Sequence, residues 1–235
     1  AMRIKGVVEV LAHDNRPPMA DKDEAYKDDV APDGSPFRPL YDDKVMFNGQ
    51  PIALVVAETS EAARYAASLV KVEYQEEAHV TDLYKQRNAA HPVRTPANPF
   101  EALFAPPPPR GNADKALAAA AVRHEGEYYV PIEHHNPMEL YASTVIHEAG
   151  GKLTIYDKTQ GVQNVHNYVC HIFGMKPEDV RVMGPFMGGG FGSGLRPQFQ
   201  VVLAVLAVTA VGWKLGLNSI LSFWIIYVLT RPLGA

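Results

Sequence analysis

The chain has 235 residues, of which 47% are hydrophobic and 20% are charged, so it is long enough for one large or two small domains that bury a core. Its net charge of -4 argues against a nucleic-acid-binding surface. The single cysteine, Cys170, excludes an internal disulfide framework, an iron–sulfur cluster and a Cys-rich zinc site within the chain. The first residues show no apolar core followed by a small-residue cleavage site, so no signal peptide is predicted.

Residues 1–85 are predicted to form a mixed α/β unit. A strand is expected over residues 4–12, and residues 13–43, rich in Pro, Asp and Lys, are expected to be a long surface loop. Asn48-Gly49 separates two short apolar runs within residues 44–57. Because both residues tolerate the positive φ of a type I′ turn, this dipeptide predicts a β-hairpin.

A helix and a further strand are predicted to complete this unit. Thr59 or Ser60 can cap the helix, and Glu61 suits its first turn. Its apolar side is expected to consist of Ala62, Ala63, Tyr65, Ala66, Leu69 and Val70. The alternating residues 70–74 predict the strand.

Residues 86–122 are predicted to be a Pro-rich connector between two lobes. Four consecutive prolines at 106–109 favour a stiff, extended spacer. Residues 115–122 are rich in alanine and predict a short helix, with Asp114 as its N-cap.

The second lobe is predicted to begin near Arg123. Strands are expected over residues 127–130, 144–147 and 152–156, and Gly150-Gly151 is expected to form the turn between the last two.

Helices and strands are predicted to alternate in the rest of this lobe. Thr159 can cap a helix that runs to about Phe173, where Gly174 is well placed to end it. Residues 179–183 predict a strand, and residues 198–211 a buried helix.

The C-terminal part is unusually apolar. Between residues 199 and 229 the only charge is Lys214. A membrane span needs about twenty consecutive apolar residues, and residues 212–216 interrupt this run. We therefore favour a buried helix followed by a strand over a transmembrane segment.

The most unusual stretch of the sequence is Met-Gly-Gly-Gly-Phe-Gly-Ser-Gly at residues 187–194, directly after the predicted strand 179–183. Glycine allows positive φ and a close approach of the backbone to another group. The run fits neither a P-loop nor a G-x-G-x-x-G pattern. Taken alone, it is compatible with both a ligand-binding loop and a flexible turn.

Few other residues form a recognisable catalytic or metal-binding pattern. His134 and His135 are adjacent, and neighbours in an extended chain point to opposite faces, so one is expected to be hydrogen-bonded inside and one to line a cleft. His166 and His171 are expected to be structural or partly exposed, and Cys170 to be a small buried residue. Gln160 lies between a predicted strand and a predicted helix, where a polar side chain can donate to an anion or an oxo group.

Several segments together resemble the molybdenum-cofactor-binding large subunit of the xanthine dehydrogenase/aldehyde oxidase family. They are residues 133–139 (Glu-His-His-Asn-Pro-Met-Glu), residues 156–165 around Thr-Gln-Gly, residues 173–182, the loop 187–194, and Val-Leu-Thr-Arg at 228–231. The resemblance extends from about residue 4 to residue 210. It is nearest to the bacterial aldehyde oxidoreductases that carry molybdopterin cytosine dinucleotide.

The resemblance implies an α+β fold with three parts: an α/β hammerhead domain over residues 1–85, the connector 86–122, and the first part of a molybdopterin-binding domain over residues 123–235. It also implies hydroxylation of an aldehyde or N-heterocycle, in which water supplies the oxygen and molybdenum takes two electrons. Iron–sulfur clusters and FAD would lie on partner subunits. Because a signal on such a partner can export the relatives, both the cytoplasm and the periplasm remain open.

Specific residues acquire roles from this resemblance. Gln160 would hydrogen-bond an oxo ligand of molybdenum, while Gly161 and the amides of Gly190, Phe191 and Gly192 would face the cofactor. Phe191 and Leu195 would contact the substrate. No residue of this chain is expected to ligate the metal directly.

Two departures from the family qualify this interpretation. Purine-oxidising relatives place a glutamate four positions after the loop phenylalanine, where this chain has Leu195, so an apolar or aromatic aldehyde is the expected substrate. The family subunit is about three times longer, and its general-base glutamate lies in a C-terminal part, so the chain is expected to be an N-terminal fragment without a catalytic residue of its own. The alternatives are an inactive remnant or interaction module without cofactor and, less favoured, a membrane-anchored domain.

Overall fold

The computed structural model describes residues 1–27, 36–90, 107–108, 110–215 and 224–229. The chain falls into two compact units, one made of residues 1–72 with 135–235 and the other of residues 73–134. The predicted limits 1–85, 86–122 and 123–235 remain a prediction.

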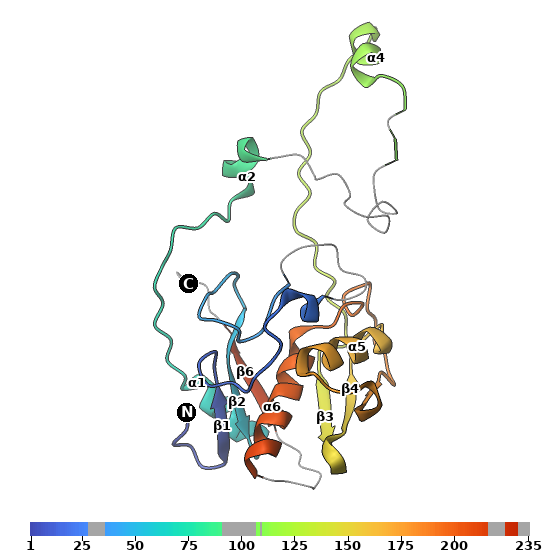
Figure 1. The fold of residues 1–235 in the computed structure, drawn as a ribbon. Helices are drawn as coiled ribbons and strands as arrows, with labels where there is room; N and C mark the ends of the chain where they lie inside the picture. Colours follow the sequence, from blue (N-terminus) through green and yellow to red (C-terminus); the bar gives the residue numbers. More distant parts are fainter. Residues whose placement is uncertain (28–35, 91–106, 109, 216–223, 230–235) are drawn as a thin grey trace. The chain divides into compact units, whose positions relative to one another are not determined.

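The larger unit contains a three-stranded antiparallel sheet in the order β1-β2-β6 (Figure 1). The strands are β1 (Val7–Leu11), β2 (Pro51–Ala57) and β6 (Trp224–Leu229). Helix α1 (Ser60–Ser68) packs on this sheet. Residues 54–57 of the central strand β2 are all fully buried, so both faces of the sheet are covered there.

The predicted hairpin at Asn48-Gly49 is only half correct. The turn forms, with the Gln50 amide donating to the Phe47 carbonyl at 3.3 Å, but residues 44–47 form no strand. The Gln50 side chain instead accepts from Met46 N at 2.8 Å and donates to Lys44 O at 2.7 Å. These backbone groups therefore bond to a side chain instead of a neighbouring strand.

Two other predictions for the first 85 residues need correction. Residues 70–74 form no strand, and the position beside β2 is taken by β6. The predicted loop 13–43 contains a short 3₁₀ helix, η1 (Asp23–Tyr26). Its Tyr26 is buried, donates to Ala20 O at 2.8 Å and packs edge-to-face on Tyr168.

A second sheet of the same unit has the order β3-β4-β5. Strands β3 (Ser143–His147) and β4 (Leu153–Asp157) are antiparallel, and β4 runs parallel to β5 (Val180–Met183). The 3₁₀ turn η3 (Ala149–Gly151) links the first two strands, with positive φ at Gly150 and Gly151. Helix α5 (Val162–Phe173) and the short η4 (Pro177–Asp179) connect β4 to β5, so this part is a β-α-β unit.

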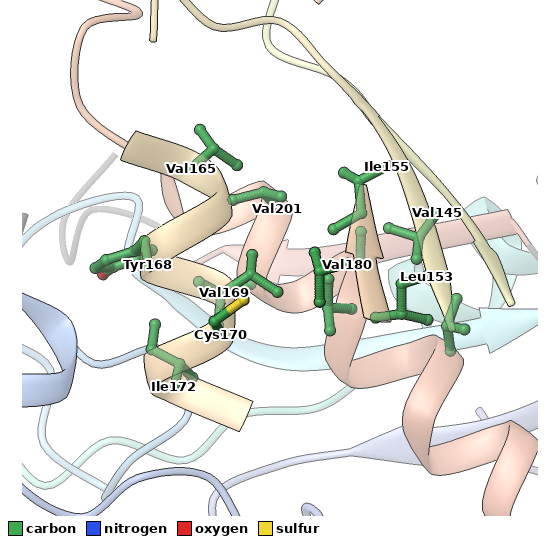
Figure 2. Packing of buried hydrophobic residues seen from close by; sticks show 14 of the residues in the cluster. Val145, Leu153, Ile155, Val165, Tyr168, Val169, Cys170, Ile172, Val180 and Val201 are labelled. Atoms are coloured by element: carbon green, nitrogen blue, oxygen red, sulfur yellow. The ribbon is translucent and has the colours of Figure 1, made fainter. Parts of the chain in front are cut away.

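Helix α6 (Phe199–Leu215) contacts the cores of both sheets and confirms the predicted buried helix. Its Val201 and Val205 pack with α5 and the second sheet, as the close view of this core shows for Val201 (Figure 2). Its Leu203 and Leu206 pack with Leu11 and Leu54 of the first sheet. A helix with apolar contacts on opposite faces has no need of a polar face, which explains the apolar sequence of residues 201–211.

The C-terminal stretch thus contains helix α6 and strand β6, as predicted, while residues 216–223 between them lie outside the described residues. In the part of the chain that is described, no helix combines the length and the apolarity that a membrane span requires.

The smaller unit contains the helices α2 (Leu83–Gln86) and α4 (Ala113–Ala119) and the 3₁₀ turn η2 (Arg87–Ala89). The N-cap of α4 is Asn112, whose Oδ1 accepts from Lys115 N at 2.9 Å, and not Asp114 as predicted. Residues 127–130 form no strand, and their side chains are exposed. Of the predicted proline spacer, Pro106 and Pro109 lie outside the described residues.

Candidate functional site

Gln160 and the glycine run follow two neighbouring parallel strands. Gln160 comes three residues after β4, and residues 187–194 come shortly after β5. Parallel strands end at the same edge of a sheet, which is where open α/β sheets bind ligands. The topology therefore brings these two segments together.

Two hydrogen bonds join the segments. The backbone N–H of Gln160 donates to Gly194 O at 2.8 Å, and Gly194 N–H donates to the Gln160 side-chain Oε1 at 3.1 Å. Since an N–H group needs an acceptor, this contact fixes the orientation of the amide. Its Nε2 is then turned away from Gly194 as a donor.

The glycine run packs too closely for larger residues. A Cβ atom at Gly190 would overlap the Gln160 side chain, and one at Gly188 would lie 2.7 Å from the Cβ of Glu139. Each added Cβ would come closer to its neighbour than real Cβ atoms do. At Gly188 the close approach of the backbone therefore requires glycine, and at Gly190 any larger residue would displace the Gln160 side chain.

Phe191 lies at the tip of a tight turn. Ser193 N–H donates to Gly190 O at 2.8 Å, and Phe191 and Gly192 have φ values of 52° and 89°. The Phe191 side chain is 78% exposed. Leu195, four positions later, is 43% exposed, and its carbonyl accepts from Asn164 Nδ2 at 3.3 Å. Both side chains are thus accessible to a small molecule.

Thr159 is not the N-cap of α5, because Gly161 occupies that position without a side-chain cap. The Thr159 hydroxyl instead accepts from Gly161 N at 3.0 Å and donates to Gly194 O at 3.2 Å. The predicted cap residue therefore joins Gly161 to the glycine run. The predicted helix end is confirmed, since Gly174 takes a left-handed φ of 63°.

A buried pair of charged residues lies at the end of β4. Lys158 is 4% exposed, with Nζ 3.5 Å from Ser193 Oγ and 4.4 Å from the centre of the Tyr141 ring. Asp157 is also buried and accepts from Ser143 Oγ at 2.5 Å. Burial raises the pKa of the Asp157 carboxyl, and the hydrogen bond from Ser143 partly offsets this effect.

Sequence reasoning noted Glu139 but missed its contact with the loop. Its carboxylate accepts from Gly188 N–H, and its own N–H donates to Gly188 O at 3.4 Å. The two residues are 49 positions apart, so no local pattern could have revealed the pair. Lys158 was likewise missed, because a lysine at the end of a strand usually faces solvent.

The histidine prediction was wrong. His134 and His135 are both exposed, so neither is enclosed in the protein. His166 Nε2 lies 3.0 Å from Pro177 O, His171 is exposed, and Cys170 is buried as predicted. Burial raises the pKa of the Cys170 thiol. Within the described residues, no group of three His, Cys, Asp or Glu side chains could hold a metal ion.

The chemistry of the site fits an anionic group with oxygen ligands. Gln160 Oε1 accepts from Gly194 N–H, which leaves its Nε2 as a donor. Lys158 Nζ lies 3.5 Å from Ser193 Oγ, and the glycines let backbone N–H groups approach a ligand. Such N–H donors can stabilise anionic oxygens, and Gln160, like Phe191, is exposed at this edge.

Comparisons with known proteins agree with this chemistry. Residues 94–215, just over half of the chain, match the family model of the molybdopterin cofactor-binding domain. Residues 1–78 match the a/b hammerhead domain of aldehyde oxidase and xanthine dehydrogenase. The chain therefore carries a molybdopterin cofactor-binding domain. It belongs to the aldehyde oxidase and xanthine dehydrogenase family, as its motifs predicted.

The curated relatives are molybdenum-binding subunits and related enzymes. The aldehyde oxidoreductase molybdenum-binding subunit PaoC of Escherichia coli strain K12 is 35% identical over 164 residues, which cover 69% of this chain and 21% of that protein. The aldehyde oxidoreductase of Megalodesulfovibrio gigas is 31% identical, over 72% of this chain and 19% of that protein. The chain thus spans about a fifth of the length of these relatives.

Solved structures confirm the fold. Aldehyde oxidoreductase from Desulfovibrio gigas matches with a TM-score of 0.66 and 22% identity, over 98% of this chain and 24% of the other. Quinoline 2-oxidoreductase from Pseudomonas putida 86 matches with a TM-score of 0.64 and 22% identity, over 88% and 26%. Together with the two family models, this likeness confirms the predicted hammerhead domain followed by a molybdopterin-binding domain.

Proposed function

We propose that the strand–helix junction at Gln160 and the glycine run 187–194 form one wall of a molybdenum-cofactor site. The observation that carries this proposal is the reciprocal hydrogen bonding of Gln160 and Gly194, which orients the Gln160 amide. Gln160 would donate to an oxo ligand of molybdenum. Gly161 and the N–H groups of residues 190–192 would face the cofactor. When bound, the cofactor would accept two electrons from the substrate.

The cofactor in this proposal is molybdopterin cytosine dinucleotide, as the family resemblance implies. Electrons would leave through iron–sulfur clusters on a small subunit and FAD on a third subunit. Within the chain itself there are too few cysteines for an iron–sulfur cluster. We propose the cytoplasm or the periplasm as its compartment.

The proposed substrate is an apolar or aromatic aldehyde, which is oxidised to a carboxylic acid with oxygen from water. Phe191 and Leu195 support this choice, because both are apolar and accessible and neither can pair with the polar edge of a purine. A phenylalanine ring can also stack on an aromatic substrate. The 35% identity to an aldehyde oxidoreductase subunit points the same way, compared with 30% for a probable xanthine dehydrogenase subunit of Bacillus subtilis.

The general base of the reaction is a glutamate that, on the family resemblance, is expected outside these 235 residues. We therefore expect the chain by itself to contribute to cofactor binding without turnover.

The proposal is tested by expressing the full chain in a host that makes the cofactor. Molybdenum and pterin are measured per chain, together with aldehyde-dependent dye reduction. We expect both cofactor components to co-purify with the chain, below one per chain, and no dye reduction. A chain that carries no molybdenum would contradict the cofactor site. Turnover by the chain alone would contradict only the expectation that the general base lies outside these 235 residues.

A further inference from the structure

The turn over residues 190–193 holds Phe191 in an unfavourable backbone conformation. Its φ of 52° and the φ of 89° at Gly192 are the pattern of a type I′ turn. Glycine adopts positive φ without steric strain, but a bulky residue that lacks a polar side chain does not. Surrounding contacts must therefore hold Phe191 in place.

Ser193 makes the contacts that close this turn. Its backbone N–H and its hydroxyl both donate to Gly190 O, at 2.8 and 2.6 Å. Because the hydroxyl has used its hydrogen, it can only accept a further bond. The Lys158 ammonium donates to it from 3.5 Å. Donation into the hydroxyl oxygen strengthens the bond that the hydroxyl makes to the Gly190 carbonyl.

Lys158 is buried next to this turn. Its side chain is 4% exposed, although an ammonium group is costly to bury without partners. Its Nζ lies 4.4 Å from the centre of the Tyr141 ring, and a Cβ on Gly194 would lie 3.5 Å from Nζ. Its backbone N–H donates to Ala142 O at 3.2 Å and anchors the residue at the end of β4.

We propose that Lys158 is a positioning residue for Phe191: through Ser193 it holds the 190–193 turn in its left-handed conformation. The consequence for cofactor and substrate rests on the proposed function, in which Phe191 forms part of the site wall. The relay of hydrogen bonds from Lys158 to Ser193, and from Ser193 to the Gly190 carbonyl, does not depend on that function.

The direct test is amide hydrogen exchange at Ser193, measured by NMR on the full chain. Lys158→Met removes the charge and keeps an unbranched apolar side chain. We expect the Ser193 amide, which donates to Gly190 O, to exchange at least about fivefold faster, as expected for weakening a single hydrogen bond. Lys152→Met is the matched control, because Lys152 is an exposed lysine at the other end of β4. It should leave the exchange unchanged.

Ser193→Ala separates the relay from a general loss of stability. We expect this variant to speed exchange in the turn, and the Lys158→Met/Ser193→Ala double variant to be no faster than the faster single variant. Additive effects, or unchanged exchange in folded Lys158→Met, would overturn the proposal. If Lys158→Met does not fold, unchanged exchange at residues 191–193 in Ser193→Ala would overturn it alone. None of these readouts needs cofactor, so a chain that fails to bind molybdenum would contradict the proposed function and leave the relay standing.

Discussion

At the scale of single residues, the site depends on positions where even one methyl group is too large. Gly190→Ala places a Cβ into the Gln160 side chain. The Gln160 side chain would then have to move aside, and it can do so only by giving up the hydrogen bond from Gly194 N–H, which contributes about 1 kcal/mol. We expect a lower midpoint of thermal or urea unfolding and reduced molybdenum per chain.

Gly212→Ala is the control for Gly190→Ala. Gly212 lies within α6, and an added Cβ would be in ordinary contact, 3.7 Å from the His147 ring. Alanine is favoured over glycine inside a helix by about 1 kcal/mol. The control should therefore be neutral or stabilising. Equal losses in both variants would show that glycine at 190 has no special role.

The buried carboxyl of Asp157 predicts a pH dependence. Burial raises its pKa in the folded chain above the unfolded value of about 3.9. The folded state therefore binds a proton more tightly, and this contribution to stability is lost as the pH rises through the folded-state pKa. Asp157→Asn removes the titration.

Urea unfolding of both proteins between pH 4 and pH 7 measures this effect. The free energy of unfolding of the wild type, relative to Asp157→Asn, should fall as the pH rises. A difference that stays constant or grows with pH would mean that ionisation of Asp157 is not penalised in the fold.

Prediction from sequence was correct for residues whose environment is set by near neighbours, and it failed for residues whose contacts are made between distant segments. Gly174 and Cys170 were correctly placed, because a helix end and a small apolar side chain depend on near neighbours. The Glu139–Gly188 contact depends on the packing of segments 49 positions apart, which sequence alone does not give.

At the scale of elements, the N-cap of α1 can be tested by substitution. Thr59 is its N-cap and its Oγ1 accepts from Ala62 N at 3.2 Å. Thr59→Ala should destabilise the chain by about 1 kcal/mol. Ser60→Ala, at the first helical position, should change stability by less than about 0.5 kcal/mol. Equal effects on the unfolding midpoint would contradict this capping assignment.

Because α6 packs on two opposite faces, we expect truncation of a side chain on either face to destabilise the chain. Leu206→Ala opens a cavity toward β1 and β2 and should cost about 2–5 kcal/mol. Val205→Ala opens a cavity toward the second sheet and should cost about 1.5–3 kcal/mol. Chemical denaturation measures both. If either substitution were neutral, that face of α6 would not be part of a core.

Element predictions failed where a strand needed a partner. Residues 44–47, 70–74 and 127–130 have strand-like sequences and yet form no strand. β-propensity reflects packing against neighbouring strands more than an intrinsic backbone preference. The pairing of β2 with β1 and β6 leaves neither edge of β2 for another strand.

At the scale of the whole molecule, the order of the strands creates the site. Since β4 and β5 are parallel neighbours, the segments that follow them meet at one sheet edge. Helix α5 gives this pair its connection, and α6 packs against both sheets. Sequence motifs singled out the two segments, and their contact is seen only in the structure, in the hydrogen bonds between Gln160 and Gly194.

The central claim, that Gln160 and the glycine run bind the molybdenum cofactor, is tested most directly by the affinity of the chain for isolated cofactor. Anaerobic equilibrium dialysis would compare the wild type with Gln160→Ala. Gln163→Ala is the control, because Gln163 is an exposed glutamine of α5 that bonds to Asn167. Loss of a hydrogen bond to a charged group should raise the Kd at least about tenfold in Gln160→Ala. Gln163→Ala should retain the wild-type Kd. Equal affinity of the wild type and Gln160→Ala, or no binding by the wild type, would contradict the claim.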